Sequence, residues 1–490
     1  TSNVRFGVNA GNSIASGGTG NVAVGDEAGT ALTTGDFNTA LGYFALHTED
    51  TASKSTAVGT SALQVQNAGT VDAFNTAVGF SAGVAITLGK LNTLIGGSAG
   101  DALNTANSNV AVGYSALSTD TKGDNSVAVG ENALLTQNFT SSTDSFNTAV
   151  GSNAGRAITS GVQNTLIGAS TGDALTDADF NTAIGHLALT SDTLGSRSTA
   201  IGMNTLRDQN FTSGTETNNT AVGHGAGLKV TTGIQNTLIG ALAGDALTDA
   251  DKNVAVGYGA LTSDTLGSKS VAIGQFTLAD QNFTSATDVF NTAVGFQAGS
   301  NVSTGIQNVL IGGRTGDALT DADHNVAVGG DSLSTDTLGS RSVAVGYACL
   351  NNQNITSAAA VNNVAVGFNA GFAMTTGLQN TLIGGQAGDS LTDADNNVAV
   401  GFLALSTNQL GSANTAIGTD SLSTSNPSSA ALTNNTAVGF HSGKLVTTGT
   451  NNTFVGSLAG DGTQTGADNT AVGKGALSAN CGAGNTAVGL

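Results

Sequence analysis

The sequence predicts an all-β fold, a parallel β-solenoid of about 28 short coils that runs without interruption from residue 1 to residue 490. Three observations predict it. The motif Asn-Thr/Val-Ala-Val/Ile-Gly recurs along the whole chain, most intervals between its glycines are 17 residues, and the composition includes 70 Gly but one Pro and no Trp. Such short, regular intervals are typical of proteins in which each repeat buries its apolar face against its neighbours.

A longer repeat overlies the short one. The glycines Gly79, Gly151, Gly223, Gly295, Gly367 and Gly439 are 72 residues apart, because every fourth interval is longer by four residues. The residue four positions after each glycine follows the order Gly, Gly, Leu, Leu within each group. The sequence therefore predicts blocks of four coils at residues 3–74, 75–146, 147–218, 219–290, 291–362, 363–434 and 435–490.

Each motif position predicts a structural role. The residue before the glycine is apolar in all 28 copies and is mostly Val or Ile, which predicts a strand with a half-buried or buried side chain. The residue two before the glycine is usually Ala. It becomes Leu in the second coil of five successive blocks, where a later Leu is replaced by Gly, so we expect core volume to be exchanged between the two positions. These residues are Leu94, Leu166, Leu238, Leu310 and Leu382.

The glycine and the Asn of the motif predict a corner and a ladder. Glycines such as Gly42, Gly168 and Gly240 are expected to adopt a positive φ or to permit close backbone approach. Asn38, Asn164 and Asn236 are expected to join a ladder of side-chain amides from coil to coil. Asn occupies this position in 23 of the 28 coils, and the exceptions are Ser55, Ser126, Ser198, Ser270 and Ser342.

Dimensions and local structure follow from the same pattern. At about 4.8 Å per coil, the array predicts a rod about 130 Å long. Segments such as residues 173–179 are predicted to be turns, because Gly and β-branched residues interrupt every helical run. Motif strands such as residues 254–256 and 343–345 are apolar on both faces, which is expected where neighbouring chains cover the outer face.

The pattern Asn-Ser/Thr-x-Ala-Val/Ile-Gly-x-x-Ala/Ser resembles the YadA-like head repeats of trimeric autotransporter adhesins, and also similar repeat arrays in phage tail fibres. The resemblance covers essentially the whole chain. It implies a left-handed parallel β-roll, assembly as a homotrimer and a role in attachment. The sequence departs from these families in its longer coil, and it contains no stalk, membrane anchor or fibre-maturation domain.

Net charge and cysteine usage restrict the partners. The formal net charge is −20, with 34 acidic and 14 basic residues, which disfavours binding to nucleic acid or to an anionic membrane. No apolar run is long enough to span a bilayer, so this segment is not expected to insert into a membrane. Cys349 and Cys481 occupy different repeat positions and predict no disulfide framework.

Acidic residues form the first candidate site. Carboxylates recur on one predicted turn, and such oxygen ligands suit Ca²⁺, although their spacing matches no established calcium loop. The alternative is turn capping together with surface ion pairs, because Arg197, Lys269 and Arg341 lie 18 residues after the last Asp of three groups. The groups are Asp173, Asp177 and Asp179; Asp245, Asp249 and Asp251; Asp317, Asp321 and Asp323; and Asp389, Asp393 and Asp395.

Aromatic residues and insertions form two more candidates. All four tyrosines directly follow a motif glycine, where their rings would stack on glycans or pack between coils or between chains; they are Tyr43, Tyr114, Tyr258 and Tyr347. The four-residue insertions at 137–140, 209–212, 281–284 and 353–356 predict loops on one side of the solenoid, either for binding or without function.

No enzymatic activity and no cofactor are predicted, because the five histidines are scattered over different repeat positions and no catalytic spacing recurs. We expect an extracellular shaft or adhesin segment that attaches to a surface, through a host glycan or protein receptor. A phage tail fibre is the first interpretation and a bacterial trimeric adhesin head the second. A solenoid that binds ice or mineral through rows of Thr165, Thr237 and Thr381 is an alternative of another class.

Overall fold

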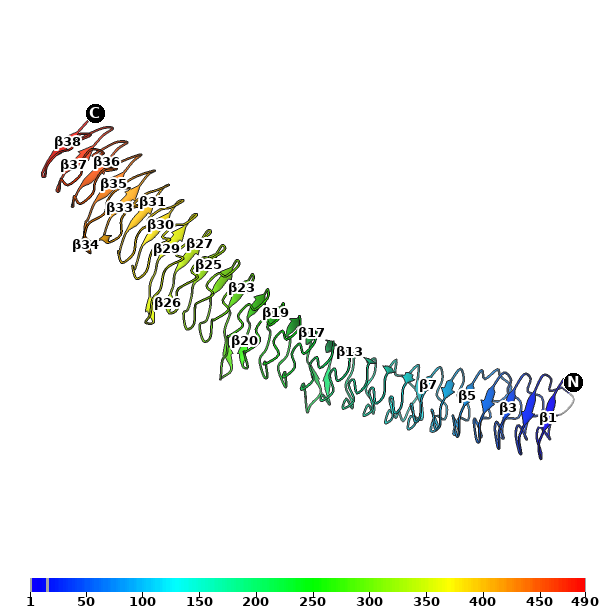
Figure 1. Ribbon diagram of the computed structural model, residues 1–490. Helices are drawn as coiled ribbons and strands as arrows, with labels where there is room; N and C mark the ends of the chain where they lie inside the picture. The colour runs from blue at the N-terminus through cyan, green and yellow to red at the C-terminus, as the bar shows by residue number, and fades with distance from the viewer. Residues whose placement is uncertain (1, 15–16, 490) are drawn as a thin grey trace. The chain divides into compact units, whose positions relative to one another are not determined.

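A computed structural model describes residues 2–14 and 17–489, which form strands, turns and loops. The chain divides into two compact units, residues 1–249 and 250–490, and the division lies inside the predicted block 219–290. Each unit is a stack of coils of one type (Figure 1). The predicted parallel β-solenoid of about 28 coils, each of roughly 17 residues, is confirmed. Within the described residues no helix is suited to crossing a bilayer.

Each coil contributes one three-residue motif strand. In the first unit these strands are β1 (Val4–Phe6), β2 (Val22–Val24), β3 (Thr39–Leu41), β4 (Thr56–Val58), β5 (Thr76–Val78), β6 (Thr93–Ile95), β7 (Val110–Val112), β9 (Val127–Val129), β11 (Thr148–Val150), β12 (Thr165–Ile167), β13 (Thr182–Ile184), β15 (Thr199–Ile201), β17 (Thr220–Val222) and β18 (Thr237–Ile239). In the second unit they are β19 (Val254–Val256), β21 (Val271–Ile273), β23 (Thr292–Val294), β24 (Val309–Ile311), β25 (Val326–Val328), β27 (Val343–Val345), β29 (Val364–Val366), β30 (Thr381–Ile383), β31 (Val398–Val400), β33 (Thr415–Ile417), β35 (Thr436–Val438), β36 (Thr453–Val455), β37 (Thr470–Val472) and β38 (Thr486–Val488).

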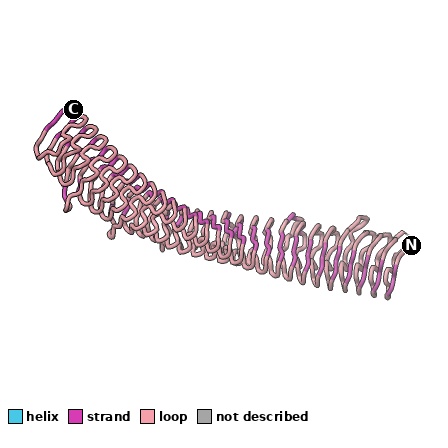
Figure 2. The backbone as a smooth tube through the Cα atoms, turned by 45° about the horizontal axis from the view of Figure 1, so that its top comes forward, coloured by secondary structure: helices cyan, strands magenta, loops and turns pink. Residues whose placement is uncertain are grey.

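Successive motif strands pair in parallel and in register. Strand β11 pairs with β12 so that Thr148 lies opposite Thr165 and Ala149 opposite Leu166. In the second unit, β19 pairs with β21 in the same way. Within each unit the strands follow one another from coil to coil, while turns and loops complete each coil (Figure 2). Equivalent motif positions therefore form columns, so that a property repeated in the sequence becomes a continuous row on the structure.

Strand alternation decides which motif residues enter the core. In β15, Ala200 points inward and is fully buried, while Thr199 and Ile201 point outward and are half-buried. The residue before the glycine is half-buried or exposed in every described motif strand, as at Ile167, which is 38% exposed. The expectation of a half-buried side chain at this position therefore holds, and that of a fully buried one is wrong.

The exchange of core volume between Leu and Gly is confirmed at the atomic level. Leu166 is fully buried, and a Cβ added to Gly172 would lie 2.9 Å from Leu166 Cδ2 and 2.8 Å from Leu175 Cδ1. In the second unit, Phe454 takes the place of the Leu, and a Cβ on Gly460 would lie 2.5 Å from its ring. The larger side chain therefore occupies the space that the glycine leaves empty.

The motif glycine meets both conditions expected of a corner. Gly168 has φ +136°, and a Cβ there would lie 2.7 Å from the carbonyl carbon of Gly185 in the next coil. Gly42 and Gly240 have φ of +139° and +132°. Any side chain at this corner would collide with the backbone of the neighbouring coil, so close stacking of the coils requires glycine.

The motif Asn links coil to coil, as predicted, but its main partner is backbone. Asn164 Oδ1 accepts a hydrogen bond from the backbone N–H of Asn181 at 3.0 Å, and its Nδ2 donates to the Ala178 carbonyl at 2.8 Å. Asn38 makes the same two bonds, to the Ser55 N–H and the Ala52 carbonyl, both at 2.9 Å. Bonds between amides of the column also occur, from 2.9 Å between Asn485 Nδ2 and Asn469 Oδ1 to 3.4 Å between Asn236 Nδ2 and Asn219 Oδ1.

The Leu column predicts a specific loss of stability. Leu166→Ala should lower the free energy of unfolding by about 2–5 kcal/mol. The substitution leaves a cavity, and the stacked coils cannot move closer together to fill it. Leu88, which is 56% exposed on a turn, supplies the matched control. Leu88→Ala should change stability by less than about 0.5 kcal/mol. Chemical denaturation followed by circular dichroism measures both, and equal losses would contradict this description of the core.

Candidate functional site

Small two-stranded parallel sheets, called inserted sheets below, lie beside the main one, and their second strands follow the predicted insertions. The pairs are β8 (Gly123–Asp124) with β10 (Thr143–Asp144), β14 (Gly195–Ser196) with β16 (Thr215–Glu216), β20 (Gly267–Ser268) with β22 (Thr287–Asp288), β26 (Gly339–Ser340) with β28 (Ala359–Ala360), and β32 (Gly411–Ser412) with β34 (Ala431–Leu432). The insertions are only partly surface loops. Gln209 and Phe211 are buried, whereas Asn210 and Thr212 are exposed.

A polar pair interrupts the apolar core in each full block that carries Ser at the motif Asn position. Seven residues after successive motif glycines stand Ile158, Leu175, Asp192 and Gln209, all fully buried. Asp192 Oδ1 accepts backbone N–H groups of Gly195 and Phe211 at 3.1 and 3.0 Å, and Oδ2 accepts Gln209 Nε2 at 2.6 Å. A buried carboxylate without a cation is tolerated here because three donors surround it.

Gln209 connects this carboxylate to the Asn column. Its Nε2 also donates to Ser198 Oγ at 2.9 Å, and its Oε1 accepts Asn219 Nδ2 at 2.9 Å. At the Ser198 position the hydroxyl accepts from Gln209, and the Gln209 amide oxygen, not the column residue, binds the Asn219 amide. The Ser exceptions to the Asn motif therefore have a cause, which sequence reasoning missed. The signal for it is present: in each of these coils a Gln follows the Ser by eleven residues.

The sixth block tests this interpretation within the same chain. There the three positions change together, to Asn408, Asn414 and Ser425. The Asn408 amide forms reciprocal bonds with Gly411 at 2.8 Å, and Asn414 Oδ1 accepts the Thr433 hydroxyl at 2.8 Å. The carboxylate, the Gln and the Ser are replaced as a set, as expected of one hydrogen-bonded network.

The Asp groups cap neighbouring coils. Asp177 accepts the Ser160 hydroxyl at 2.6 Å, Asp179 accepts the Val162 N–H at 2.8 Å, and Asp173 accepts the Thr190 hydroxyl. Equivalent bonds reach Asp249, Asp321, Asp323, Asp393 and Asp395. Across residues 2–14 and 17–489, no three His, Cys, Asp or Glu side chains form a group that could hold a metal ion. These hydrogen bonds are the ones expected from turn capping, which was the alternative to calcium binding.

The expected ion pairs have different partners. Arg197 pairs with Glu216 at 3.0 Å and Lys269 pairs with Asp288 at 2.6 Å, both across the inserted sheets. The Arg197 backbone N–H, not its guanidinium, bonds to the Asp179 carbonyl at 3.0 Å. The assignment of Asp179 as the ion-pair partner of Arg197 is therefore wrong, because the longer fourth coil brings a second acidic residue beside the cation.

The tyrosines lie exposed along one corner. Tyr43, Tyr114, Tyr258 and Tyr347 are between 48% and 63% exposed. Two of them contact a ring on the next coil: Tyr258 meets Phe276 edge-on at 5.3 Å, and Tyr347 stacks on Phe368 at 5.9 Å. The exposed ring faces are accessible for stacking on a glycan. The contacts with rings of the next coil are the packing between coils that was the alternative to glycan binding.

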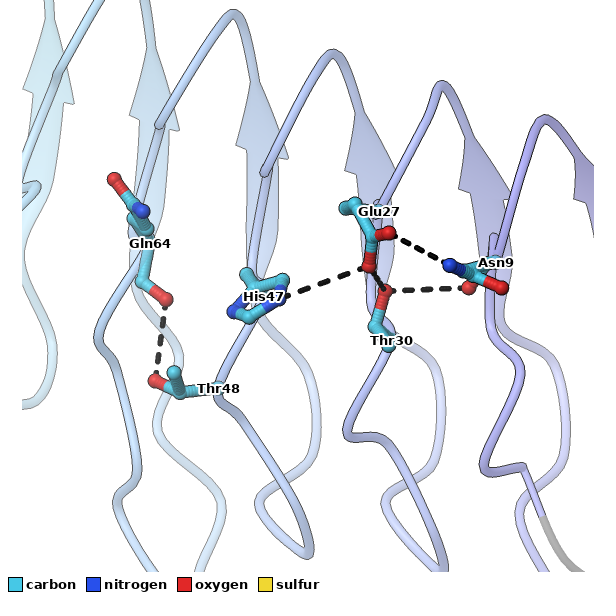
Figure 3. Close-up of polar contacts among 6 residues, drawn as sticks. All are labelled: Asn9, Glu27, Thr30, His47, Thr48 and Gln64. Carbon is cyan, nitrogen blue, oxygen red and sulfur yellow. Dashed lines mark hydrogen bonds and ion pairs between the residues drawn. The ribbon is translucent and has the colours of Figure 1, made fainter.

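Histidine and cysteine take part in local contacts. In the first coils His47 lies 3.8 Å from Glu27, whose other oxygen accepts the Asn9 amide at 2.7 Å, so that polar contacts join successive coils (Figure 3). Cys349 is buried, and burial raises the pKa of its thiol. Cys481 is half-buried, and both cysteines are free.

The outer face of the motif strands carries two parallel columns. One is formed by the Val and Ile residues before the glycine, with Ile95, Ile167 and Ile239 between 38% and 40% exposed. The other contains Thr or Val two residues earlier, and Thr165, Thr237 and Thr381 are half-buried there. The Val and Ile column is apolar along both units and the other column is mixed, while the inner face is already filled by Ala and Leu.

A scan against protein-family models finds none that matches this chain, and a search of curated proteins finds no significant match to its sequence.

The buried network predicts a rescue. Gln209→Ser should lower the free energy of unfolding by about 1–3 kcal/mol, because Asp192 loses a buried donor. Adding Asp192→Asn and Ser198→Asn copies the sixth block and should restore part of the loss. Urea denaturation at pH 7 compares the single and triple variants. A triple variant no more stable than the single one would mean that the positions act independently.

Two other carboxyl groups predict a pH effect. Asp317 and Asp389 each have a buried Oδ1 without a hydrogen-bond partner, and burial raises the pKa of both carboxyl groups. Folding therefore favours their protonated form, and the destabilisation by their charge is present above the raised pKa and lost as pH falls below it. Asp317→Asn should raise the unfolding temperature at pH 7 but not at pH 3. Asp321→Asn, which removes an exposed acceptor, is the control and should not raise it at either pH.

Proposed function

We propose that this chain is a non-enzymatic shaft segment whose copies associate through the outer face of the motif strands. The observation that supports this is the column of Val and Ile side chains, half-buried or exposed along both units. In a stack of 14 coils this column runs for about 65 Å. Monomeric soluble proteins seldom expose a continuous apolar surface of this length, and such a surface is typical of an interface with another protein.

The finer architecture belongs to the same proposal. The resemblance of the motif to YadA-like and tail-fibre repeats supports three chains around one axis and a left-handed β-roll, and the 72-residue spacing of the glycines supports a block of four coils. Covering the apolar column with sister chains leaves the corners and inserted sheets at the surface. A shaft of this kind holds many copies of the same corner at fixed spacing, which suits attachment to a repetitive surface.

We place the protein outside the cell, as part of a phage tail fibre in the first instance and of a bacterial trimeric adhesin head in the second. The partner is then a glycan or protein receptor. The net charge of −20 makes nucleic acid an unfavourable partner, because association with phosphates depends on basic surface.

Binding to ice or mineral is a second candidate, and one observation favours it. Six consecutive coils of the first unit carry Thr on the outer face, from Thr148 to Thr237, and the strands pair so that each Thr lies opposite the next. A regular row of hydroxyl and methyl groups suits an ordered surface. This candidate needs the outer face to be uncovered, whereas the shaft needs it covered. A thermal-hysteresis assay tests it directly.

The mass in solution tests the shaft. One chain has a mass of 47.8 kDa, so a trimer has about 143 kDa, and we expect light scattering after gel filtration to give the larger value. Replacing Ile95 and Ile167 by Asp places charges in the apolar column and should give monomers that retain the β circular dichroism spectrum. Leu88→Asp, an equally large change on an exposed turn, should leave the trimer intact. A wild-type mass of one chain would overturn the proposal.

A further inference from the structure

A shallow pocket lies where an inserted sheet meets the main solenoid. Its volume is about 200 Å³, and it is lined by Asp179 and Phe180 of one coil, Ser196 and Arg197 of the next, and Thr215 and Glu216 of the inserted segment. The pairing of β14 with β16 holds the last two residues beside Arg197. The pocket therefore brings one ring, one cation and two carboxylates to a single corner.

We infer that this corner binds a neutral sugar ring of a surface polysaccharide, which deepens the proposed attachment function and rests on it. Phe180 is 46% exposed, and its ring lies 5.5 Å from the Arg197 guanidinium. The accessible ring face suits the apolar C–H face of a pyranose, as aromatic side chains combine flat apolar contact with low entropy cost. Arg197 donates to sugar hydroxyls, and the carboxylates of Asp179 and Glu216 accept from them.

Charge selects the class of sugar. The pocket is lined by two carboxylates and one guanidinium, so the corner has a net negative charge. Sialic acids, uronic acids and sulfated sugars would place like charges against Asp179 and Glu216, which opposes binding. Neutral hexoses and N-acetylhexosamines carry the hydroxyls that the corner can bind without this repulsion.

The same combination of groups recurs at two other corners. Lys54 Nζ lies 2.7 Å from Asp72 and 5.1 Å from the centre of the Phe74 ring. Lys269 Nζ lies 2.6 Å from Asp288 and 5.1 Å from the centre of the Phe290 ring. The ring comes from the following coil in these two corners and from the preceding coil at Phe180. One chemical combination is thus assembled in two different ways.

The fold itself does not require this combination. Strands β8 and β10 pair in the same register with Asn125 and Asp144 at the corner, and β32 pairs with β34 beside Ala413 and Leu432. A second pocket, beside β26 and β28, keeps Arg341 but has His324 and Ala360 where the first has Phe180 and Glu216. Because inserted sheets also form where the complete set of ring, cation and carboxylate is missing, these groups are available for a ligand.

An array of immobilised neutral and anionic oligosaccharides tests the inference with the full chain. The test variant replaces Phe74, Phe180 and Phe290 by Ser. The control makes the same change at three phenylalanines of similar exposure that directly follow motif glycines and lie outside these corners, namely Phe296, Phe402 and Phe440. We expect the wild-type chain and the control to retain neutral oligosaccharides, and the test variant to lose at least tenfold in apparent affinity.

Two results would overturn the site: no neutral oligosaccharide is retained by the wild-type chain, or the test variant binds as the wild type does. The mass of each preparation separates this failure from that of the shaft. If the preparation is a trimer but gives either of these results, the sugar site is wrong and the shaft proposal stands. If the preparation is a monomer that binds neutral sugars through the three phenylalanines, the sugar site stands and the shaft proposal is wrong.

Discussion

The hydrogen bonds that each Asn side chain makes between coils are the constraint on which the structure depends. A strand of three residues is too short to be stable alone, so every coil must satisfy its polar backbone through its neighbours. Asn164 reaches the backbone of two positions in the next coil, through Asn181 and Ala178. These bonds hold neighbouring coils so close that no side chain fits at the corner of Gly168, where an added Cβ would lie 2.7 Å from the backbone of the next coil.

Stacking in register turns each motif position into a surface or a core of its own. The Ala column and its Leu substitutions fill the interior, the Val and Ile column makes the outer face apolar, and the corners display rings and charges. The residue type at one motif position therefore determines the chemical character of a whole column along the unit. A simple sequence can therefore build a closed core and also carry the face that we propose for association and the repeated corner that we propose for ligands.

Much of the fold was predictable from the sequence. The interval between glycines specifies the coil, and the opposite substitutions at Leu166 and Gly172 indicate a core contact from residue types alone. The outward direction of Ile167 was not predictable from its neighbours, because the motif strand is apolar on both faces and alternation permits either orientation. Asp192 and Gln209 were missed as core residues because polar side chains are usually exposed. The partner of Arg197 depended on where four inserted residues place Glu216, which spacing alone does not determine.

In the proposed shaft, the inner face of each strand packs within one chain and the outer face packs between chains. A cryo-electron microscopy map of the purified protein tests this arrangement most directly. We expect three coiled stacks around one axis, with the side chains of Ile95, Ile167 and Ile239 turned towards that axis and the inserted sheets at the periphery. Isolated stacks with these isoleucines facing solvent, or an assembly joined through the inserted sheets, would contradict it.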